Sequence, residues 1–158
     1  MIATEKKQEV EQFVRSFIEE FKVRYEIEPT VIYNMAVQKV DIHILEKVVN
    51  DVLWESNPKQ YTDGIRKKSR QLSLAEHRQV FYKVAREMGY NYSYLARFLG
   101  FDHATAIHAV KKVSMMLNIK DKVIGTIYSK IKNKLNDKEY IQNIGREQAQ
   151  SESDLSAL

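Results

Sequence analysis

The sequence predicts an all-α fold, and three observations support this. Only 2 prolines and 5 glycines occur in 158 residues, too few turn formers for a sandwich or barrel of short strands. Apolar residues recur at spacings of three and four along several segments, which is the period of amphipathic helices. The chain has no cysteine, which excludes a disulfide framework and thiolate metal ligands.

Charge and hydropathy narrow the functional class. No apolar run approaches the roughly 18 residues of a membrane span, and the N-terminus lacks the apolar core of a secretory signal. We therefore expect a cytoplasmic protein without a membrane partner. Residues 1–58 carry 7 basic and 11 acidic side chains, whereas residues 59–122 carry 13 basic and 5 acidic ones. The basic segment favours a polyanionic partner, with a merely solvated basic face as the alternative.

The first predicted helix covers residues 5–25 and is amphipathic. Its apolar stripe consists of Val10, Phe13, Val14, Phe17, Ile18, Phe21 and Tyr25. Pro29 ends this pattern, and residues 31–54 then predict one or two helices with a break near Asp41. The second stripe consists of Ile42, Leu45, Val48, Val49, Val52 and Leu53. We assign residues 1–41 to an N-terminal helical extension.

The centre of the chain begins with a connector (56–64) and a basic loop (65–70). Ser73 and Glu76 match a capping box, which predicts a helix running to Met88 and stopped by Gly89. The stripe of this helix that should face the core is Leu74, Phe81, Val84, Ala85 and Met88.

Three further helices are predicted from their caps. Ser93 caps a short helix that Gly100 ends, and Asp102 caps a longer helix from His103 to about Leu117. Asp121 caps the last helix, which runs to about Leu135. The side chains of this helix expected to point inward are Val123, Ile124, Ile127, Ile131 and Leu135. Residues 136–158 are polar and nearly aperiodic, which predicts a mobile tail.

The short helix, the glycine turn and the helix from His103 have the order of a helix-turn-helix unit, whose second helix enters the major groove of DNA. The core stripe of that second helix is Ile107, Val110, Val113 and Leu117. Side chains suited to phosphates and base edges lie largely off this stripe, and they are His103, Thr105, His108, Lys111 and Lys112.

These residues resemble a known family. The segment DHATAIHAVKKV (102–113) resembles the signature of the C-terminal DNA-binding domain of the bacterial replication initiator DnaA, which reads Gly-Arg-Asp-His-Thr-Thr-Val-x-His-Ala. HRQVFYKVAREM (77–88) is similar to the family's preceding helix, which opens with an Arg-Gln pair, and LARFLG matches the turn between the two helices. The likeness covers residues 42–135. It implies a helical bundle with a helix-turn-helix DNA-binding domain.

The resemblance also implies which residues contact DNA. A loop arginine that enters the minor groove matches Arg70, or Lys68 if the alignment contains a short gap. Arg78 and Arg86 match phosphate contacts, and Asp102 and His103 match the major-groove edge. The positions implied to contact DNA are, in full, Lys68, Arg70, Arg78, Arg86, Asp102, His103, Ala104, Thr105, His108 and Lys112.

Two positions depart from the family's pattern. Phe101 stands where the family has arginine, after a turn one residue shorter, and Ala104 stands where the family has a threonine that touches bases. Alanine can pack on a thymine methyl group but has no hydroxyl, so we do not expect the family's DNA-box sequence to be the target here.

No sequence feature predicts an enzyme. The G-x-x-x-x-G-K-[ST] loop is absent, so neither a nucleotide cofactor nor the initiator's ATPase motor is expected. His103 and His108 lie five residues apart, which misaligns them as a metal pair on a helix, and no metal site is expected.

The function expected from the sequence is therefore specific binding of double-stranded DNA at a replication origin or regulatory site, by a cytoplasmic, nucleoid-associated protein. The alternative is a protein-interaction module that keeps the helix-turn-helix fold but has lost specific DNA binding. The apolar stripe of residues 5–25 either packs on the helix at 42–54 or pairs with a second copy or another protein.

Overall fold

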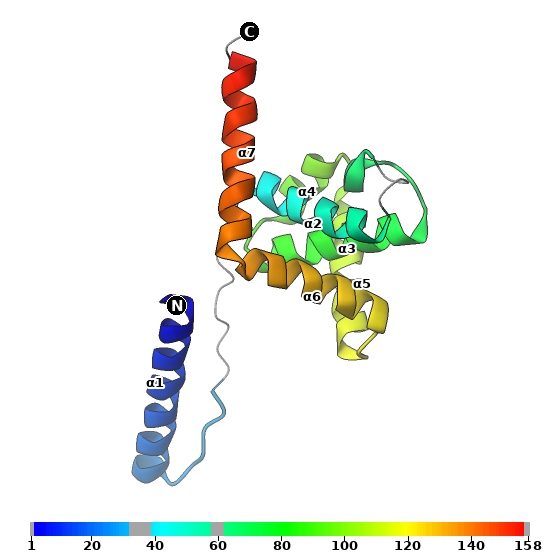
Figure 1. Cartoon of the computed structure of the whole chain (residues 1–158). Coiled ribbons are helices and arrows are strands. Elements are labelled where there is room, and N and C mark those ends of the chain that lie inside the picture. Colours follow the sequence, from blue (N-terminus) through cyan, green and yellow to red (C-terminus); the bar gives the residue numbers. More distant parts are fainter. Residues whose placement is uncertain (1, 32–38, 58–61, 157–158) are drawn as a thin grey trace. The chain divides into compact units, whose positions relative to one another are not determined.

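The computed structural model describes residues 2–31, 39–57 and 62–156 of the chain (Figure 1). Seven α-helices, one short 3-10 helix and no strand occur in these residues, so the predicted all-α fold is confirmed. The elements are α1 (Ile2–Tyr25), α2 (Ile42–Ser56), η1 (Gly64–Arg66), α3 (Leu72–Glu87), α4 (Tyr92–Leu99), α5 (His103–Asn118), α6 (Lys122–Asn136) and α7 (Lys138–Ser156). None of these helices combines the length and the apolar character needed to cross a membrane.

The chain divides into two compact units, Met1–Met35 and Ala36–Leu158. The described part of the first unit is α1 with the extended residues that follow it. Glu26 ends α1 in a left-handed conformation (φ 56°). Phe13, Phe17 and Tyr25 on the predicted apolar stripe are 73%, 45% and 54% exposed, and the other four residues of the stripe are half-buried.

The second unit is built around α3, which packs against α2, α4, α5 and α6. The largest buried side chains are Phe81 and Tyr82 on α3 and Leu45 and Leu53 on α2. Every predicted stripe residue of α2 and α3 is buried, which confirms the two helical periods read from the sequence. Burial of each large side chain of this kind is worth about 1.5–3 kcal/mol relative to exposure, so both stripes stabilise the unit.

Side-chain caps begin the helices that follow. Asp102 Oδ1 accepts a hydrogen bond from the Thr105 amide at 2.7 Å, and Asp121 Oδ1 accepts one from the Ile124 amide at 2.9 Å. Both predicted caps are confirmed. Asp41 caps α2 through the His43 amide (2.9 Å), which explains the predicted break. The expectation of a second helix before this break falls on residues 32–38, which lie outside the described residues.

The structure corrects two predicted serine caps. α3 begins at Leu72, so Ser73 lies inside its first turn, where its hydroxyl accepts a hydrogen bond from the Asn57 side-chain amide at 3.2 Å. The cap of α4 is Asn91, which accepts from the Tyr94 amide at 2.8 Å, and the predicted cap Ser93 is helical. Both helices start earlier than the serines indicated, and asparagine competes well with serine for the cap position.

The structure also corrects the C-terminal boundary expected for the second unit. Residues 136–158 were predicted as a mobile tail, but Lys138–Ser156 form α7, and the unit extends over the former boundary at residue 135. Ile144 is buried, and the Tyr140 hydroxyl donates to Asp51 Oδ2 on α2 at 2.5 Å. The C-terminal half of α7 stands clear of the other helices of this unit (Figure 1). On α6, the predicted core residue Val123 is 53% exposed.

A buried asparagine holds the start of the basic loop against α2. Asn50 Oδ1 accepts the Ile65 amide at 2.9 Å, and Ile65 is itself fully buried. Gly64 has a φ of +66°, and a Cβ there would lie 2.4 Å from Asn50 Oδ1. The close approach requires glycine, and it fixes where the loop leaves the core.

Candidate nucleic-acid interface

α4 and α5 are joined by a tight turn that sets the direction of α5. Gly100 adopts a left-handed conformation (φ +75°), its amide donates to the Arg97 carbonyl at 3.2 Å, and the Phe101 amide donates to the Ala96 carbonyl at 2.9 Å. These two bonds form the Schellman motif that ends a helix at glycine. Ala96 and Ala106 are both buried, and their small side chains let α4 and α5 pack closely.

The first turn of α5 faces solvent. His103 and Ala104 are exposed, as predicted for residues that reach base edges. The Thr105 hydroxyl donates to Asp102 Oδ1 at 2.8 Å, so this predicted phosphate neighbour also serves the helix cap. Hydrogen bonds from the Thr105 amide and hydroxyl lower the pKa of Asp102, which therefore keeps a negative charge at the start of α5.

A cleft between α3 and α5, which we call the α3–α5 cleft, brings four predicted site residues together. They are Arg78, Thr105, His108 and Lys112. The cleft has a volume of about 190 Å³, and Ala75, Gln79, Tyr82 and Ala109 complete its lining. Two of its side-chain atoms, Gln79 Oε1 and the Tyr82 hydroxyl oxygen, are buried without a hydrogen-bond partner among the described residues. Burial raises the pKa of Tyr82 to about 12, so the phenol keeps its proton.

Arg78 has a structural function that the sequence did not predict. Only 7% of the residue is exposed, and its guanidinium donates from Nε to the Ile65 carbonyl at 2.9 Å and from Nη2 to the Lys67 carbonyl. Two of its donors bind backbone carbonyls of the basic loop, so Arg78 clamps this loop to α3. Its contact with the DNA backbone stays a prediction.

Phe101, at a position where the resembled family has arginine, also contacts this clamp. The Phe101 ring lies 4.4 Å from the Arg78 guanidinium and 5.8 Å from the Lys68 ammonium, measured to the ring centroid. Cations over an aromatic face are stabilised, more strongly where water is excluded. The aromatic residue of the helix-helix turn thus connects α3, the basic loop and the start of α5.

The basic loop is only partly available to a partner. Arg66 makes a two-bond ion pair with Glu46 on α2, with distances of 2.6 and 2.9 Å, and its guanidinium lies 4.4 Å from the Phe98 ring centroid. Lys67, Lys68 and Arg70 are exposed. Within this loop, the positive charge that can reach a ligand is therefore concentrated in residues 67–70.

Two predicted site residues outside the cleft share an aromatic neighbour. The Arg86 guanidinium lies 4.7 Å from the Tyr92 ring centroid, and the His103 ring lies 6.0 Å from it. Arg86 Nη1 also donates to the Tyr90 carbonyl at 3.1 Å. Tyr92 therefore orients one basic side chain from the end of α3 and one imidazole from the start of α5.

Sequence reasoning missed Gln79 and Tyr82 as parts of the cleft. A signal was available, because Ala75, Gln79 and Tyr82 lie at spacings of four and three on the flank of α3 that also carries Arg78. Their buried polar atoms became apparent only from the packing of α5 against that flank.

Comparisons with known proteins identify no relative of this chain. No family model, no curated protein and no solved structure gives a significant match.

Proposed function

We propose that the unit formed by α2–α7 binds double-stranded DNA with the N-terminal half of α5 and the basic loop. The observation that carries this proposal is the α3–α5 cleft, where His108 and Lys112 lie beside two unpartnered polar groups of α3. A polar, basic hollow next to an exposed helix N-terminus suits a backbone phosphate, and such contacts fix the register of a protein on a duplex.

The chemistry of the cleft matches one phosphate group. Lys112 supplies an ammonium, the Tyr82 hydroxyl supplies a donor, and the Gln79 amide supplies another after a half-turn about its last torsion. Burial raises the pKa of Glu76, and the nearby Lys112 charge opposes this effect, so the charge of Lys112 is partly compensated by Glu76 before DNA binds. A phosphate oxygen in the cleft gives the buried Tyr82 hydroxyl the partner that it lacks.

Recognition of the DNA base sequence is assigned to His103 and Ala104, with Asp102 beside them. The imidazole offers a donor or acceptor to a base edge, the alanine methyl suits a thymine methyl, and the Asp102 carboxylate accepts from a cytosine amino group. For the minor groove, Arg70 is favoured over Lys68, because Lys68 already lies over the Phe101 ring. A narrow minor groove attracts arginine in particular.

The resemblance of residues 77–113 to the C-terminal domain of DnaA makes a replication origin or a regulatory site the proposed target. The alternative is a helix-turn-helix module that binds a protein. The two differ in one measurement, the salt dependence of duplex binding, because phosphate contacts release counterions whereas a protein-binding module has none to release.

The test is a titration of fluorescent random duplex at increasing salt. With Arg66 and Arg78 engaged inside the protein, about four phosphate contacts remain, and log affinity should fall against log salt with a slope of about −4. Lys112→Gln should make this slope shallower by about one unit, while Lys138→Gln, a matched change at the start of α7, should leave it unchanged. A slope near zero for the unaltered chain refutes DNA binding.

For the first unit we propose self-association through α1. Phe13, Phe17 and Tyr25 are 73%, 45% and 54% exposed on one stripe, and leaving them in water is unfavourable. Residues 2–25 carry 5 basic and 5 acidic side chains, so two copies do not repel each other. In sedimentation, Phe13→Gln with Phe17→Gln should convert a dimer to a monomer, while Val23→Gln on another face should not. A monomeric unaltered chain refutes the proposal.

A further inference from the structure

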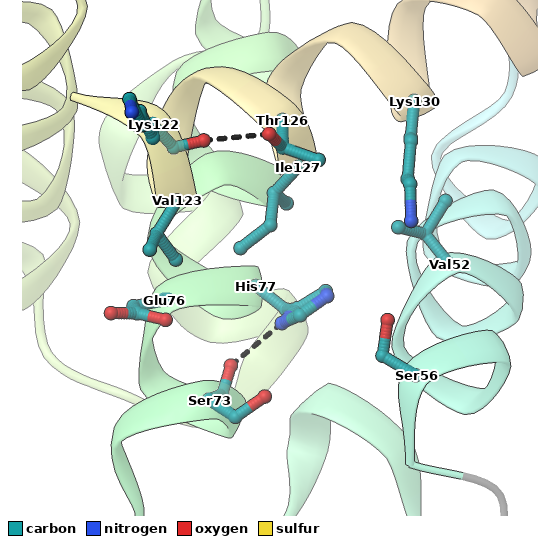
Figure 2. A pocket seen from close by; sticks show the side chains of 10 residues that line it. All are labelled: Val52, Ser56, Ser73, Glu76, His77, Lys122, Val123, Thr126, Ile127 and Lys130. Atoms are coloured by element: carbon teal, nitrogen blue, oxygen red, sulfur yellow. Dashed lines mark hydrogen bonds between the residues drawn. The ribbon is translucent and has the colours of Figure 1, made fainter.

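A second cleft lies on the other side of α3, between α2 and α6, and we call it the α6 cleft. It has a volume of about 410 Å³, within the range of small-molecule sites. Val52, Val123 and Ile127 form its apolar part, and the polar lining residues are Ser56, Ser73, Glu76, His77, Lys122, Thr126 and Lys130 (Figure 2). None of these residues is proposed to contact DNA, although the charge of Glu76 also acts on Lys112.

His77 supplies an unused polar atom to this cleft. The residue is only 3% exposed, and its Nδ1 donates to the Ser73 carbonyl at 2.7 Å. A carbonyl can only accept, so Nδ1 carries a proton, and Nε2 is left buried with no partner among the described residues. Buried polar atoms of this kind are rare in native proteins and call for an explanation.

The free ring nitrogen faces one end of the cleft. In Figure 2 it points away from Ser73, toward the end where the Lys130 side chain reaches down from α6 and the Ser56 hydroxyl rises from the end of α2. Lys130 is exposed, so its side chain can take other rotamers that admit a ligand to this end of the cleft. An ammonium, a hydroxyl and an imidazole converging from three helices form a set of donors for an oxyanion.

Glu76 lies at the opposite end of the cleft from Lys130, with His77 and Ile127 between them (Figure 2). Its carboxylate excludes a second anionic group there and suits a hydroxyl or amino group. We propose that the α6 cleft binds a small phosphate monoester, with its oxyanion held by Lys130, Ser56 and a protonated His77 and a hydroxyl or amino group near Glu76.

Binding of the oxyanion is coupled to uptake of a proton. In the free protein burial lowers the pKa of His77, the Ser73 hydrogen bond opposes this effect, and the nearby Lys130 charge lowers the pKa further. The charged groups lining the cleft are Glu76 on α3 and Lys122 and Lys130 on α6, while α2 contributes only Val52 and Ser56. An anion beside Nε2 neutralises Lys130 and stabilises the imidazolium, so it raises the His77 pKa.

The test follows the imidazole signals of the four histidines by NMR in the full chain while sulfate is added at constant ionic strength. Sulfate keeps both charges over the pH range used, so any pH dependence comes from the protein. Sulfate should shift His77 but not His43, and its affinity should rise up to about tenfold for each pH unit lowered between the bound and free pKa values. Glycerol 3-phosphate should bind more tightly than sulfate, and glycerol should not bind.

Three variants separate the contributions. Lys130→Gln should weaken sulfate binding about tenfold, as expected for loss of one charged hydrogen-bond partner. Lys138→Gln should leave it unchanged. His77→Gln keeps a donor but cannot titrate, so it should abolish the pH dependence of binding. If His77→Gln does not fold, the Lys130→Gln comparison decides the matter.

The proposal is overturned if sulfate and glycerol 3-phosphate leave the His77 signal in place, or if Lys130→Gln binds as tightly as the unaltered chain. A short DNA duplex that moves the His77 signal as sulfate does also overturns it, since the cleft then receives a backbone phosphate. Loss of DNA binding alone leaves this test intact, because no residue of the α6 cleft is substituted in the salt-slope measurement.

Discussion

Replacing Arg78 with methionine should destabilise the second unit and release the basic loop. Methionine keeps most of the side-chain volume but removes the hydrogen bonds to the Ile65 and Lys67 carbonyls and the contact with the Phe101 ring. Each hydrogen bond to a charged group contributes about 1.5–3 kcal/mol, and the loss is reduced by the desolvation that the guanidinium no longer suffers. The expected decrease in the free energy of unfolding is about 2–4 kcal/mol.

Urea denaturation followed by circular dichroism measures this change, and thermal melting should show a midpoint lower by about 4–16 °C. Arg78→Lys is the informative companion, because a lysine keeps the charge but has no planar fork to reach two carbonyls. We expect it to recover less than half of the loss. Hydrogen exchange should accelerate at the Ile65 amide in both variants. Unchanged stability of Arg78→Met would show that the guanidinium does not hold the loop.

Four further predictions concern other sites. His103→Ala should flatten the preference among duplex sequences and cost roughly 1–3 kcal/mol on the best site, as measured by selection from random duplexes. Gly64→Ala should lower the unfolding free energy by about 1–3 kcal/mol, because φ is positive there and the new methyl meets Asn50. Tyr140→Phe should speed hydrogen exchange in α7, since its bond to Asp51 is lost. The unfolding free energy should decline as pH falls below about 6.5, because the unfolded chain then protonates His77 while the folded state, with its lowered pKa, does not.

Each of these has its own control. Lys112→Ala should weaken all duplexes equally, so equal and sequence-blind losses in both interface variants would place His103 away from the bases. Gly145→Ala, at a helical glycine with open space around its Cα, should not destabilise the chain. Exchange in α7 that is unaffected by Tyr140→Phe would contradict the tether to α2. The acid-induced loss should be smaller in His77→Gln, and an identical pH profile would exclude His77 as its source.

Local features of the fold were predictable where one segment determines its own structure. The α2 and α3 stripes, the Asp102 and Asp121 caps and the glycine stop at position 100 each depend on residues within one or two turns. The Ser93 cap failed because Asn91, two residues earlier, is an equally good cap, whereas nothing local favours Gln71 over Ser73. The helix α7 was missed because its buried contact is concentrated at Ile144, too sparse an apolar pattern to stand out in a polar segment.

The candidate site was predictable in part, for a related reason. The positions on α5 follow from one helical period, and the structure brings Thr105, His108 and Lys112 to one cleft. The role of Arg78 was not accessible, because its acceptors lie 11 and 13 residues earlier in the chain, across a loop whose path no local rule determines. The unpartnered atoms of Gln79 and His77 likewise depend on how neighbouring helices pack against α3.

The stacking of Phe101 on Arg78 constrains how this sequence can diverge. An arginine at position 101 would replace the aromatic face beside the Arg78 guanidinium with a second cation, so Phe101→Arg alone should weaken the clamp on the loop. Because Arg78 binds the carbonyls of residues 65 and 67, a substitution at position 101 acts on the loop without altering any residue in it. On the proposed DNA interface, a change of binding preference can therefore arise from a substitution in the helix-helix turn.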